Sequence, residues 1–453
     1  MTKLYTARWV LPMAAAAIED GAVVVEGESI VGVGTRQSLA ALFPEAEEED
    51  FGAAAIMPGL VNCHSHLELT AMRGYLEREE NNFSAWLKRL TIARQERMTP
   101  DDLYVSAAWG ALEAARAGVT CVADASDSAG SSLRALKDVG LRGIVYQEAF
   151  GPDSKLAREQ FENLREKVAR LRSSESRLAR LGVSPHAPYT VSAPLLELIS
   201  EYALAEELPL MMHAAESEAE SEFMLEGRGR FAEGLASRGI EWRAPGVSTI
   251  QYLSSLGVLH TRPLLAHCIR VDGADIQTIK DADARIAHCP KSNAKLGHGH
   301  APLVSFLKSD LKVGLGSDSV ASNNTCDLLE EARFAILMSR ALNNTEDASE
   351  TTSAVEALTL ATLGGARSLG LENHVGSLDV GKQADLIVVS LEGAHQLPFY
   401  EPEAALVFAS SGRDVRLTVV AGREVYRDNR VLSIDEERLR ARIGEIAGKL
   451  WET

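Results

Sequence analysis

Cysteine is scarce in this chain of 453 residues, and no CxxC motif or disulfide-like spacing occurs. The five cysteines are an odd number spread along the sequence: Cys63, Cys121, Cys268, Cys289 and Cys326. This pattern argues against a secreted, disulfide-stabilised protein and favours a reducing compartment. The first eight residues carry charges too early for a secretory leader, so we expect a cytoplasmic protein.

The sequence also lacks long apolar runs and an excess of basic residues. No run approaches the ~20 apolar residues that a membrane span requires. The 46 basic residues are outnumbered by 64 acidic ones, which gives a net charge of -18. Nucleic acids and anionic membranes both need clustered lysine and arginine. We therefore expect a small-molecule substrate, with no nucleic acid and no membrane partner. A homo-oligomer is compatible with the sequence, which does not fix the oligomeric state.

Eight short apolar runs are present, and each ends on polar or ionisable residues. Those residues are, in chain order, His64 with His66, Asp124, Gln147 with Glu148, His186, His213, His267, His288 and Asp318. Between the runs lie stretches with helical spacing, such as Leu103 to Ala117. Strand alternating with helix over about 300 residues predicts an α/β protein with a closed (β/α)8 TIM barrel. Chemistry in such barrels lies at the carboxyl ends of the strands, where these residues fall.

Both ends of the chain read as short strands. The clearest runs are Gly21 to Val25, Ile30 to Val33, Asp385 to Val389 and Val415 to Val420. Neither end has enough strands to bury a face alone, so we expect them to combine into one small composite β-sandwich. The predicted domains are residues 1–57 plus 375–453 for the sandwich and 58–374 for the barrel. The acidic run Glu45 to Asp50 is expected to be a solvated turn.

Four residues at the strand ends suit a metal ion. Two histidines at positions i and i+2 of a strand point to the same side, so His64 and His66 can grip one ion. His213 and Asp318 add a third imidazole and a carboxylate from later strands. This set fits Zn²⁺, with Fe²⁺ as a substitute. No lysine stands at the fourth strand end to form a bridging carbamate, so one metal is favoured over two.

Three residues around this set suit hydrolysis. A bound divalent ion lowers the pKa of its water from about 15.7 towards roughly 7. Asp318 is expected to ligate the ion and accept the proton of that water, and His267 to orient the resulting hydroxide. Glu216 comes three residues after His213, close enough to carry a proton to a ring nitrogen of the substrate. Glu216, His267 and Asp318 are therefore the predicted catalytic residues.

At these residues the chain resembles the amidohydrolase superfamily nearly from end to end. The matching segments are Pro58 to His66, Ser184 to Thr190, His213 to Glu216, Ala266 to Cys268, His288 to Gly297 and Leu315 to Asn324. The chain is most similar to the branch of mononuclear aminohydrolases that contains cytosine, guanine and S-adenosylhomocysteine/methylthioadenosine deaminases and the chlorotriazine hydrolases. The resemblance implies a barrel with a composite β-sandwich, metal ligands at His64, His66, His213 and Asp318, and proton transfer by Glu216 and His267.

The resemblance also nominates substrate-binding residues. Adenosine-type deaminases use the segment Pro185 to Thr190 to contact the substrate, which points to His186. The alternative is a histidine held rigid between two prolines for backbone reasons. Asn323 is a further candidate in the last matching segment. His288 is expected to support the site from behind its ligands. The pair His298 and His300 lies in a glycine-rich loop and is interpreted as a loop or substrate contact, not as metal ligands.

Two departures from the family pattern bear on the substrate. The glutamate that holds the ribose in S-adenosylhomocysteine/methylthioadenosine deaminases falls on Gln95, and the arginine expected after the third strand appears as Gln147 and Glu148. Both departures weaken the S-adenosylhomocysteine interpretation. Glu68 and Glu148 resemble instead the aminodeoxyfutalosine deaminase-like set, whose substrate is a 6-aminopurine nucleoside with a bulky 5′ extension. Gln95, Glu68 and Glu148 are therefore included as substrate-binding candidates.

The first functional hypothesis is a metal-dependent hydrolytic deaminase of a 6-aminopurine nucleoside-like substrate, of the aminodeoxyfutalosine, methylthioadenosine, S-adenosylhomocysteine or adenosine type. A second is an amidohydrolase that acts on another nitrogen heterocycle, such as guanine, a pterin, cytosine or a triazine. A third is a catalytically dead metal-binding scaffold, which the intact Glu216, His267 and Asp318 argue against.

Overall fold

Eight parallel strands form the centre of the computed structural model, which describes residues 2–79, 82–343 and 351–451. The strands are β6 (Leu60–Ser65), β7 (Val119–Ser126), β8 (Arg142–Ala149), β9 (Ala179–Pro185), β10 (Met211–Ala214), β11 (Leu264–His267), β12 (Arg285–His288) and β13 (Lys312–Leu315). They pair as two four-stranded sheets, β6 to β9 and β10 to β13. Single parallel bridges, Val183 with Leu210 and Ser65 with Asp318, join the two sheets at both edges. The predicted barrel, with all eight of its strands, is confirmed.

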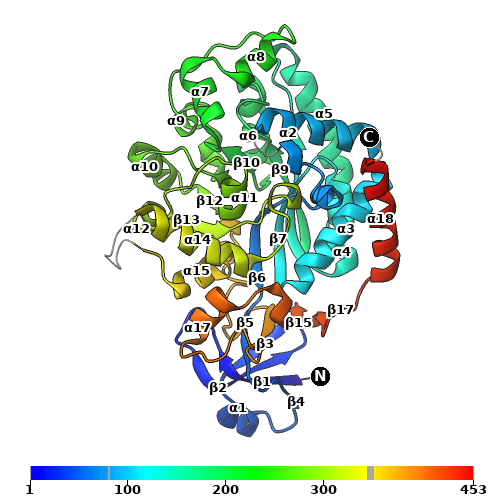
Figure 1. The fold of residues 1–453 in the computed structure, drawn as a ribbon, viewed down its shortest axis with the longest axis vertical. Coiled ribbons are helices and arrows are strands. Elements are labelled where there is room, and N and C mark those ends of the chain that lie inside the picture. The colour runs from blue at the N-terminus through cyan, green and yellow to red at the C-terminus, as the bar shows by residue number, and fades with distance from the viewer. Residues whose placement is uncertain (1, 80–81, 344–350, 452–453) are drawn as a thin grey trace.

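Helices connect successive strands and cover the outside of the barrel (Figure 1). The longer ones are α3 (Pro100–Arg116), α4 (Ala129–Val139), α5 (Ala157–Leu171), α6 (Ala193–Ala205), α10 (Gly273–Asp281) and α14 (Leu328–Asn343). Helix α3 begins where a capping box forms, because the side chain of Thr99 accepts from the N–H of Asp102 and the Asp102 carboxylate accepts from the N–H of Thr99. Helix α5 buries Phe161, Leu164 and Val168 in one stripe at helical spacing.

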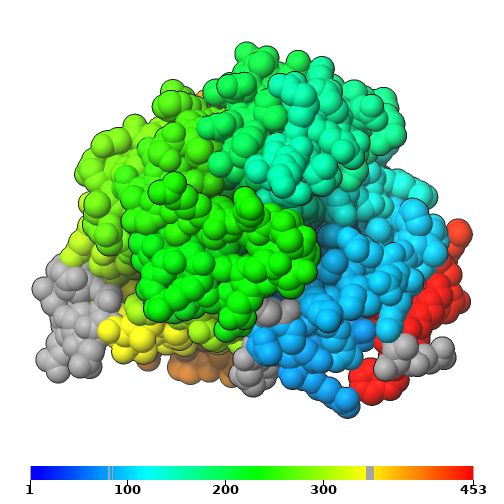
Figure 2. Space-filling model, turned by 90° about the horizontal axis from the view of Figure 1, so that it is seen from above, coloured from blue at the N-terminus to red at the C-terminus, as the bar shows by residue number. Residues whose placement is uncertain are grey.

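Further helices of the barrel region are mostly shorter. They are η1 (Leu67–Met72), α2 (Phe83–Ile92) with a π-helical turn (Ala93–Arg97), α7 (Glu218–Glu226), α8 (Arg230–Ala236), α9 (Thr249–Ser255), α11 (Pro290–Lys295), α12 (Leu303–Lys308), α13 (Val320–Asn323), α15 (Ala354–Leu360) and α16 (Leu363–Leu369). Figure 2 looks onto the face where α7 and α8, in bright green, cover the middle of the molecule. Residues 216–236 thus form a loop and two short helices over this face.

Both ends of the chain share one nine-stranded sheet below the barrel (Figure 1). Its strands are β1 (Thr2–Val10), β2 (Ile18–Glu26), β3 (Ser29–Thr35), β4 (Glu47–Asp50), β5 (Ala54–Pro58), β14 (Leu386–Ser390), β15 (Val415–Val420), β16 (Arg423–Arg427) and β17 (Arg430–Val431). The two ends meet where β5 pairs antiparallel with β14 and Met57 lies opposite Ile387. The composite nature of this unit is as predicted, while its residue boundaries stay a prediction. The last helix, α18 (Glu436–Trp451), packs against α3 of the barrel.

The acidic run near the N-terminus is not a solvated turn, and that expectation was wrong. Residues 47–50 form strand β4, which pairs parallel with β1 and places Glu48 opposite Leu4. The carboxylates are neutralised locally, because Arg36 pairs with Glu48 and Asp50 while Arg427 pairs with Glu49. Paired backbone and nearby guanidinium groups thus outweigh the low strand propensity of a run of acids.

All five cysteines are buried and none is in a disulfide. Burial raises the pKa of the Cys121 thiol to about 12 and that of Cys63 well above its usual value. The thiols therefore behave as small apolar side chains, because the reactive thiolate is absent at neutral pH. In the part of the chain that the structure describes, no helix is both long and apolar enough to cross a membrane.

A buried ion pair joins the barrel to the nine-stranded sheet. Arg142, the first residue of β8, donates from Nε and Nη2 to the two carboxylate oxygens of Asp385, at 2.9 and 3.1 Å. Asp385 also accepts from the backbone N–H of Ala421 at 2.7 Å. Arg142 is 6% exposed and Asp385 is 2% exposed, so neither charge can turn to water if the other is removed.

We predict that Asp385→Ala lowers the free energy of unfolding by about 3–5 kcal/mol, because it leaves the Arg142 charge buried and unpaired. Denaturant titration followed by circular dichroism measures the effect. Arg177→Ala is the matched control, since Arg177 pairs with Glu28 between the same two units but is largely exposed, and its cost should stay below about 1 kcal/mol. Equal losses in the two variants would show that burial of the Arg142 pair is unimportant.

Candidate metal centre and active site

Two histidines at the carboxyl end of β6 form the first part of the site. His64 and His66 point to the same side of the strand, as the two-residue repeat requires. Their Nε2 atoms lie 3.5 and 3.6 Å from Oδ1 of Asp318, which follows β13. His64 is fully buried, and its Nε2 has no hydrogen-bond partner. A buried ring nitrogen without a partner costs folding free energy unless a ligand binds it. The unpartnered Nε2 of His64 is therefore itself evidence for a bound group.

The other two predicted ligands are oriented by their neighbours. His213 at the end of β10 lies with its Nδ1 3.0 Å from the backbone oxygen of His186. Because that oxygen can only accept, Nδ1 carries the proton and Nε2 is free to bind a metal. Oδ2 of Asp318 accepts from the hydroxyls of Ser292 at 2.5 Å and Ser322 at 3.1 Å. Asp318 is thereby fixed with Oδ1 facing the histidines.

These residues fit one divalent metal ion. Ligand-type atoms of His64, His66 and His213 lie within 4.8 Å of one another, and so do those of His64, His267 and Asp318. Burial lowers the pKa of His66 to about 3 and that of His213 well below its usual value, so both imidazoles are neutral and able to coordinate. Burial opposes ionisation of Asp318, but the nearby His64, His267 and His66 outweigh it and hold its pKa well below the usual range.

Glu216 is placed beside this centre by a tightly fixed turn. The backbone N–H groups of Ala215 and Glu216 donate to the two oxygens of Glu220 at 2.8 and 2.9 Å. The Glu216 carboxyl is buried, and Tyr189 donates to it at 3.4 Å. Burial, followed by the charges of Asp318 and Glu220, raises the pKa of Glu216 well above its usual value. Burial therefore favours the neutral, proton-carrying form of Glu216, which is the form that a general acid needs.

Two histidines face Glu216. His267 at the end of β11 and His298 in the loop after α11 both place Nε2 3.7 Å from its Oε1. Neither Nε2 atom has a hydrogen-bond partner among the described residues. His267 was predicted, whereas His298 comes from the glycine-rich loop that was interpreted as a loop or substrate contact. Phe83 of α2 packs edge-on against the His298 ring, with ring centroids 4.7 Å apart.

Two of the predicted substrate residues lie next to the metal ligands. His186 follows β9, and its Nδ1 is 2.9 Å from the Thr190 hydroxyl. Ligand-type atoms of Glu148, His186 and His213 fall within 4.8 Å of one another. Glu148 is buried, its Oε1 has no partner, and burial raises its pKa to about 8. A carboxyl group that is mostly protonated at neutral pH can donate as well as accept a hydrogen bond.

Sequence reasoning missed Arg94 and chose its neighbour instead. Gln95 is exposed on the π-helical turn, whereas Arg94 is 9% exposed and points inward. The Arg94 guanidinium lies 3.4 Å from Glu68 and 3.8 Å from Glu148. Glu68 also accepts from the Ser126 hydroxyl at 2.5 Å. The turn thus presents Arg94 to the site, and Gln95 is not among the residues that the structure brings together there.

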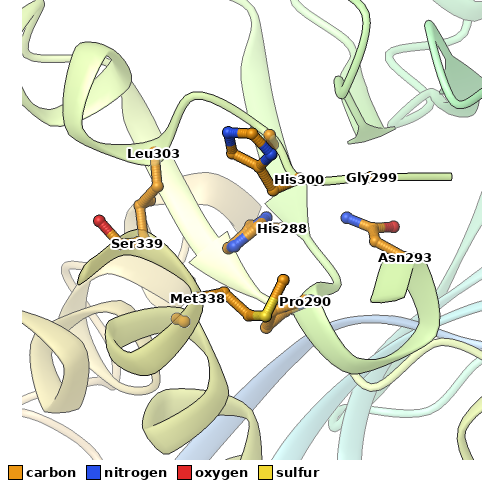
Figure 3. Close-up of a pocket in the computed structure, with 10 residues that line it drawn as sticks. His288, Pro290, Asn293, Gly299, His300, Leu303, Met338 and Ser339 are labelled. Atoms are coloured by element: carbon orange, nitrogen blue, oxygen red, sulfur yellow. The ribbon is translucent and has the colours of Figure 1, made fainter. Parts of the chain in front are cut away.

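The remaining predicted residues support their neighbours. Asn323 donates from Nδ2 to the backbone oxygen of Ser317 and to Glu331, both at 2.5 Å, and its Oδ1 is unpartnered. His288 lies behind His267 and lines a small pocket with Asn293 and the exposed His300 (Figure 3). Neither His288 nor His300 belongs to a group with metal-binding spacing among the described residues.

We predict that the purified protein holds one transition-metal ion per chain and that His213→Ala abolishes this content, because it removes one of three imidazoles from a four-ligand set. Elemental analysis after exhaustive dialysis measures the ratio. His300→Ala is the control and should keep the ion, since His300 is exposed and outside the cluster. Retention of the ion by His213→Ala would contradict the assigned ligand set.

Comparisons with known proteins agree with this geometry. The model of the amidohydrolase family matches residues 55–425. A 5-methylthioadenosine/S-adenosylhomocysteine deaminase of Pelotomaculum thermopropionicum is 33% identical over 422 residues, covering 93% of this chain and 92% of that protein. The corresponding enzyme of Symbiobacterium thermophilum is 33% identical and covers 97% of both chains.

A solved structure of a deaminase is similar to this chain in its three-dimensional fold. An adenosine deaminase from Xanthomonas campestris with bound zinc superposes with a TM-score of 0.85 at 26% identity, covering 99% of this chain and 98% of that one. The fold of this chain is therefore shared with a structure described as a deaminase with bound zinc. The chain belongs to the amidohydrolase family and is an aminohydrolase, an enzyme that hydrolyses carbon–nitrogen bonds.

Proposed function

We propose that the enzyme is a zinc-dependent deaminase that releases ammonia from a 6-aminopurine nucleoside-like substrate. The observation that carries this proposal is the buried carboxyl group of Glu216, which lies beside the imidazole cluster and is faced by His267 and His298, each with Nε2 3.7 Å from its Oε1. The relatives named for methylthioadenosine and S-adenosylhomocysteine deamination support the substrate class. The nitrogen-rich ligand set favours Zn²⁺ over harder ions.

The protein groups can perform the proton transfers that deamination needs. A bound divalent ion supplies a water whose pKa is lowered towards roughly 7. Asp318, ionised at neutral pH, accepts a proton from the attacking water. Glu216, whose pKa burial raises well above its usual value, delivers a proton to a ring nitrogen, so that the attacked carbon becomes tetrahedral without a full negative charge on the ring. The proton that Asp318 accepted then passes to the exocyclic amine, which leaves as ammonia. Glu216 takes back the remaining proton of the added hydroxyl, whose oxygen stays on the ring as a carbonyl oxygen.

Next to these groups, His186 and Glu148 are the proposed substrate contacts. The unpartnered Oε1 of Glu148 can bond to a substrate hydroxyl or amine, and Arg94 holds the other oxygen of this carboxyl at 3.8 Å. Glu68 acts through Arg94, because its Oε1 lies 3.4 Å from the same Nη1 atom that is near Glu148. Asn323 remains a proposed substrate contact, because its buried Oδ1 has no hydrogen-bond partner among the described residues. A buried polar group without a partner in the protein selects strongly for a ligand that supplies one.

We predict that Glu216→Gln keeps about one metal ion per chain yet lowers turnover by roughly 10²-fold or more, the usual cost of losing a general acid–base group. Steady-state kinetics together with elemental analysis separate the two effects. Glu218→Gln is the control two residues away, because Glu218 is exposed and pairs only with Arg270. Loss of the ion from Glu216→Gln would contradict a role in proton transfer alone.

The substrate class is tested with adenosine, 5′-methylthioadenosine, S-adenosylhomocysteine and aminodeoxyfutalosine. We expect ammonia release and the change in ultraviolet absorbance from adenine to hypoxanthine for at least one of them, with kcat/KM above about 10⁴ M⁻¹s⁻¹ for the preferred compound. Glu148→Gln should raise KM for that compound more than it lowers kcat, since Glu148 contacts the substrate away from the reacting carbon. Turnover of guanine or a triazine in place of all four would overturn the proposal.

A further inference from the structure

The short helix α11 connects two functional groups that lie on different strands. Its Ser292 hydroxyl donates to Asp318 at 2.5 Å, and the next residue, Asn293, accepts at Oδ1 from Nδ1 of His267 at 2.8 Å. Ser292 and Asn293 are both almost completely buried. The helix follows β12 directly and begins with Pro290, which fixes its first turn against the barrel. Neither Ser292 nor Asn293 has a role in the function proposed above.

The contact with Asn293 determines which nitrogen of His267 carries the proton. An amide oxygen accepts hydrogen bonds but cannot donate them, so the ring is protonated on Nδ1. The lone pair is then on Nε2, the atom that lies 3.7 Å from Glu216 and has no partner in the described structure. In the opposite tautomer, Nδ1 and the Asn293 oxygen would be two acceptors facing each other, which is unfavourable in a buried site.

The Asn293 amide turns its oxygen to His267, and its buried Nδ2 has no hydrogen-bond partner among the described residues. In Figure 3 this nitrogen points towards the pocket beside His288 and the oxygen points away from that pocket. The backbone of the same residue holds the second histidine, because the carbonyl oxygen of Asn293 accepts from the N–H of His298 at 3.0 Å. Asn293 therefore contacts the ring of His267 and the backbone of His298, the two histidines that face Glu216.

We propose that Asn293 is a positioning residue, which holds His267 as the Nδ1–H tautomer and thereby directs the Nε2 lone pair at the water that is to react. The backbone at His267 and Cys268 has positive φ, 75° and 47°, and the N–H groups of Cys268 and Ile269 hold this segment to the carbonyl oxygens of Ala214 and Ala215. Left-handed backbone in non-glycine residues persists only where surrounding contacts hold it. The tautomer assignment is independent of the substrate, and only the kinetic part of the test rests on the proposed deaminase activity.

The tautomer is tested on the protein without any substrate. Nitrogen-15 NMR of histidine-labelled, metal-loaded protein distinguishes protonated from unprotonated ring nitrogens, and the His267 signals are those that disappear in His267→Asn. We expect a protonated Nδ1 in the natural sequence and in Asn293→Asp, which keeps an acceptor oxygen in the same place. We expect loss of that single tautomer in Asn293→Leu. A proton on Nε2 of His267 in the natural sequence would overturn the proposal.

The kinetic test uses the same variants with the preferred nucleoside. Asn293→Leu should lower kcat by about 10- to 100-fold, the usual cost of removing a residue that orients an active-site imidazole, while KM and metal content stay near their starting values. Asn293→Asp should recover most of this loss. The effect should vanish in the His267→Asn background, because the residue that Asn293 acts on is then absent.

The control is Lys295→Met on the same helix, whose side chain pairs with Glu77 and Asn324 and contacts neither Asp318 nor His267. It should leave kcat and the His267 signals unchanged, which separates positioning from general weakening of α11. Equal kcat losses from Asn293→Leu with and without His267, or no loss at all, would overturn the proposal. Absence of turnover in the natural sequence would refute the deaminase activity and leave the NMR result to decide on Asn293.

Discussion

The site depends on the closure of the barrel between its last and first strands. The N–H of Asp318 donates to the backbone oxygen of His64 at 2.8 Å, which brings the carboxylate from β13 against the imidazoles of β6. Gly316 makes this approach feasible, because a Cβ at that position would lie 2.8 Å from the Cβ of His64. A barrel that closed less tightly would leave the oxygen ligand out of reach of an ion held by the histidines.

Much of this centre is predictable from the sequence. The barrel strands are buried on both faces, so they read as short apolar runs, and the first polar residue after each run marks a strand end. His64, His66, His213, His267 and Asp318 were found in that way, and the structure brings all five together. The composite sheet was predictable for a related reason, since neither chain end has enough strands to cover an apolar face alone.

The residues that were missed lie where regular periodicity stops. Helix α2 continues into a π-helical turn, which changes the direction of its side chains and presents Arg94 in place of Gln95. His298 reaches Glu216 from a loop between two glycines, where no repeat indicates orientation. Strand β4 was hidden by its acidic composition, because the arginines that neutralise it are distant in sequence. In each case tertiary contacts determine the position of the side chain or the strand, which the local sequence pattern does not indicate.

The pairing of β5 with β14 has a consequence for biosynthesis. Met57 and Ile387 are neighbours in the sheet but roughly 330 residues apart along the chain. At a translation rate of about 5–20 residues per second, the ribosome delivers the second strand roughly a quarter of a minute to a minute after the first. Throughout that interval the edge of β5 that pairs with β14 has no partner, and the apolar residues of β5 are not yet covered. The nascent chain therefore carries an unpaired strand edge, which is open to pairing with other chains, until synthesis is nearly complete.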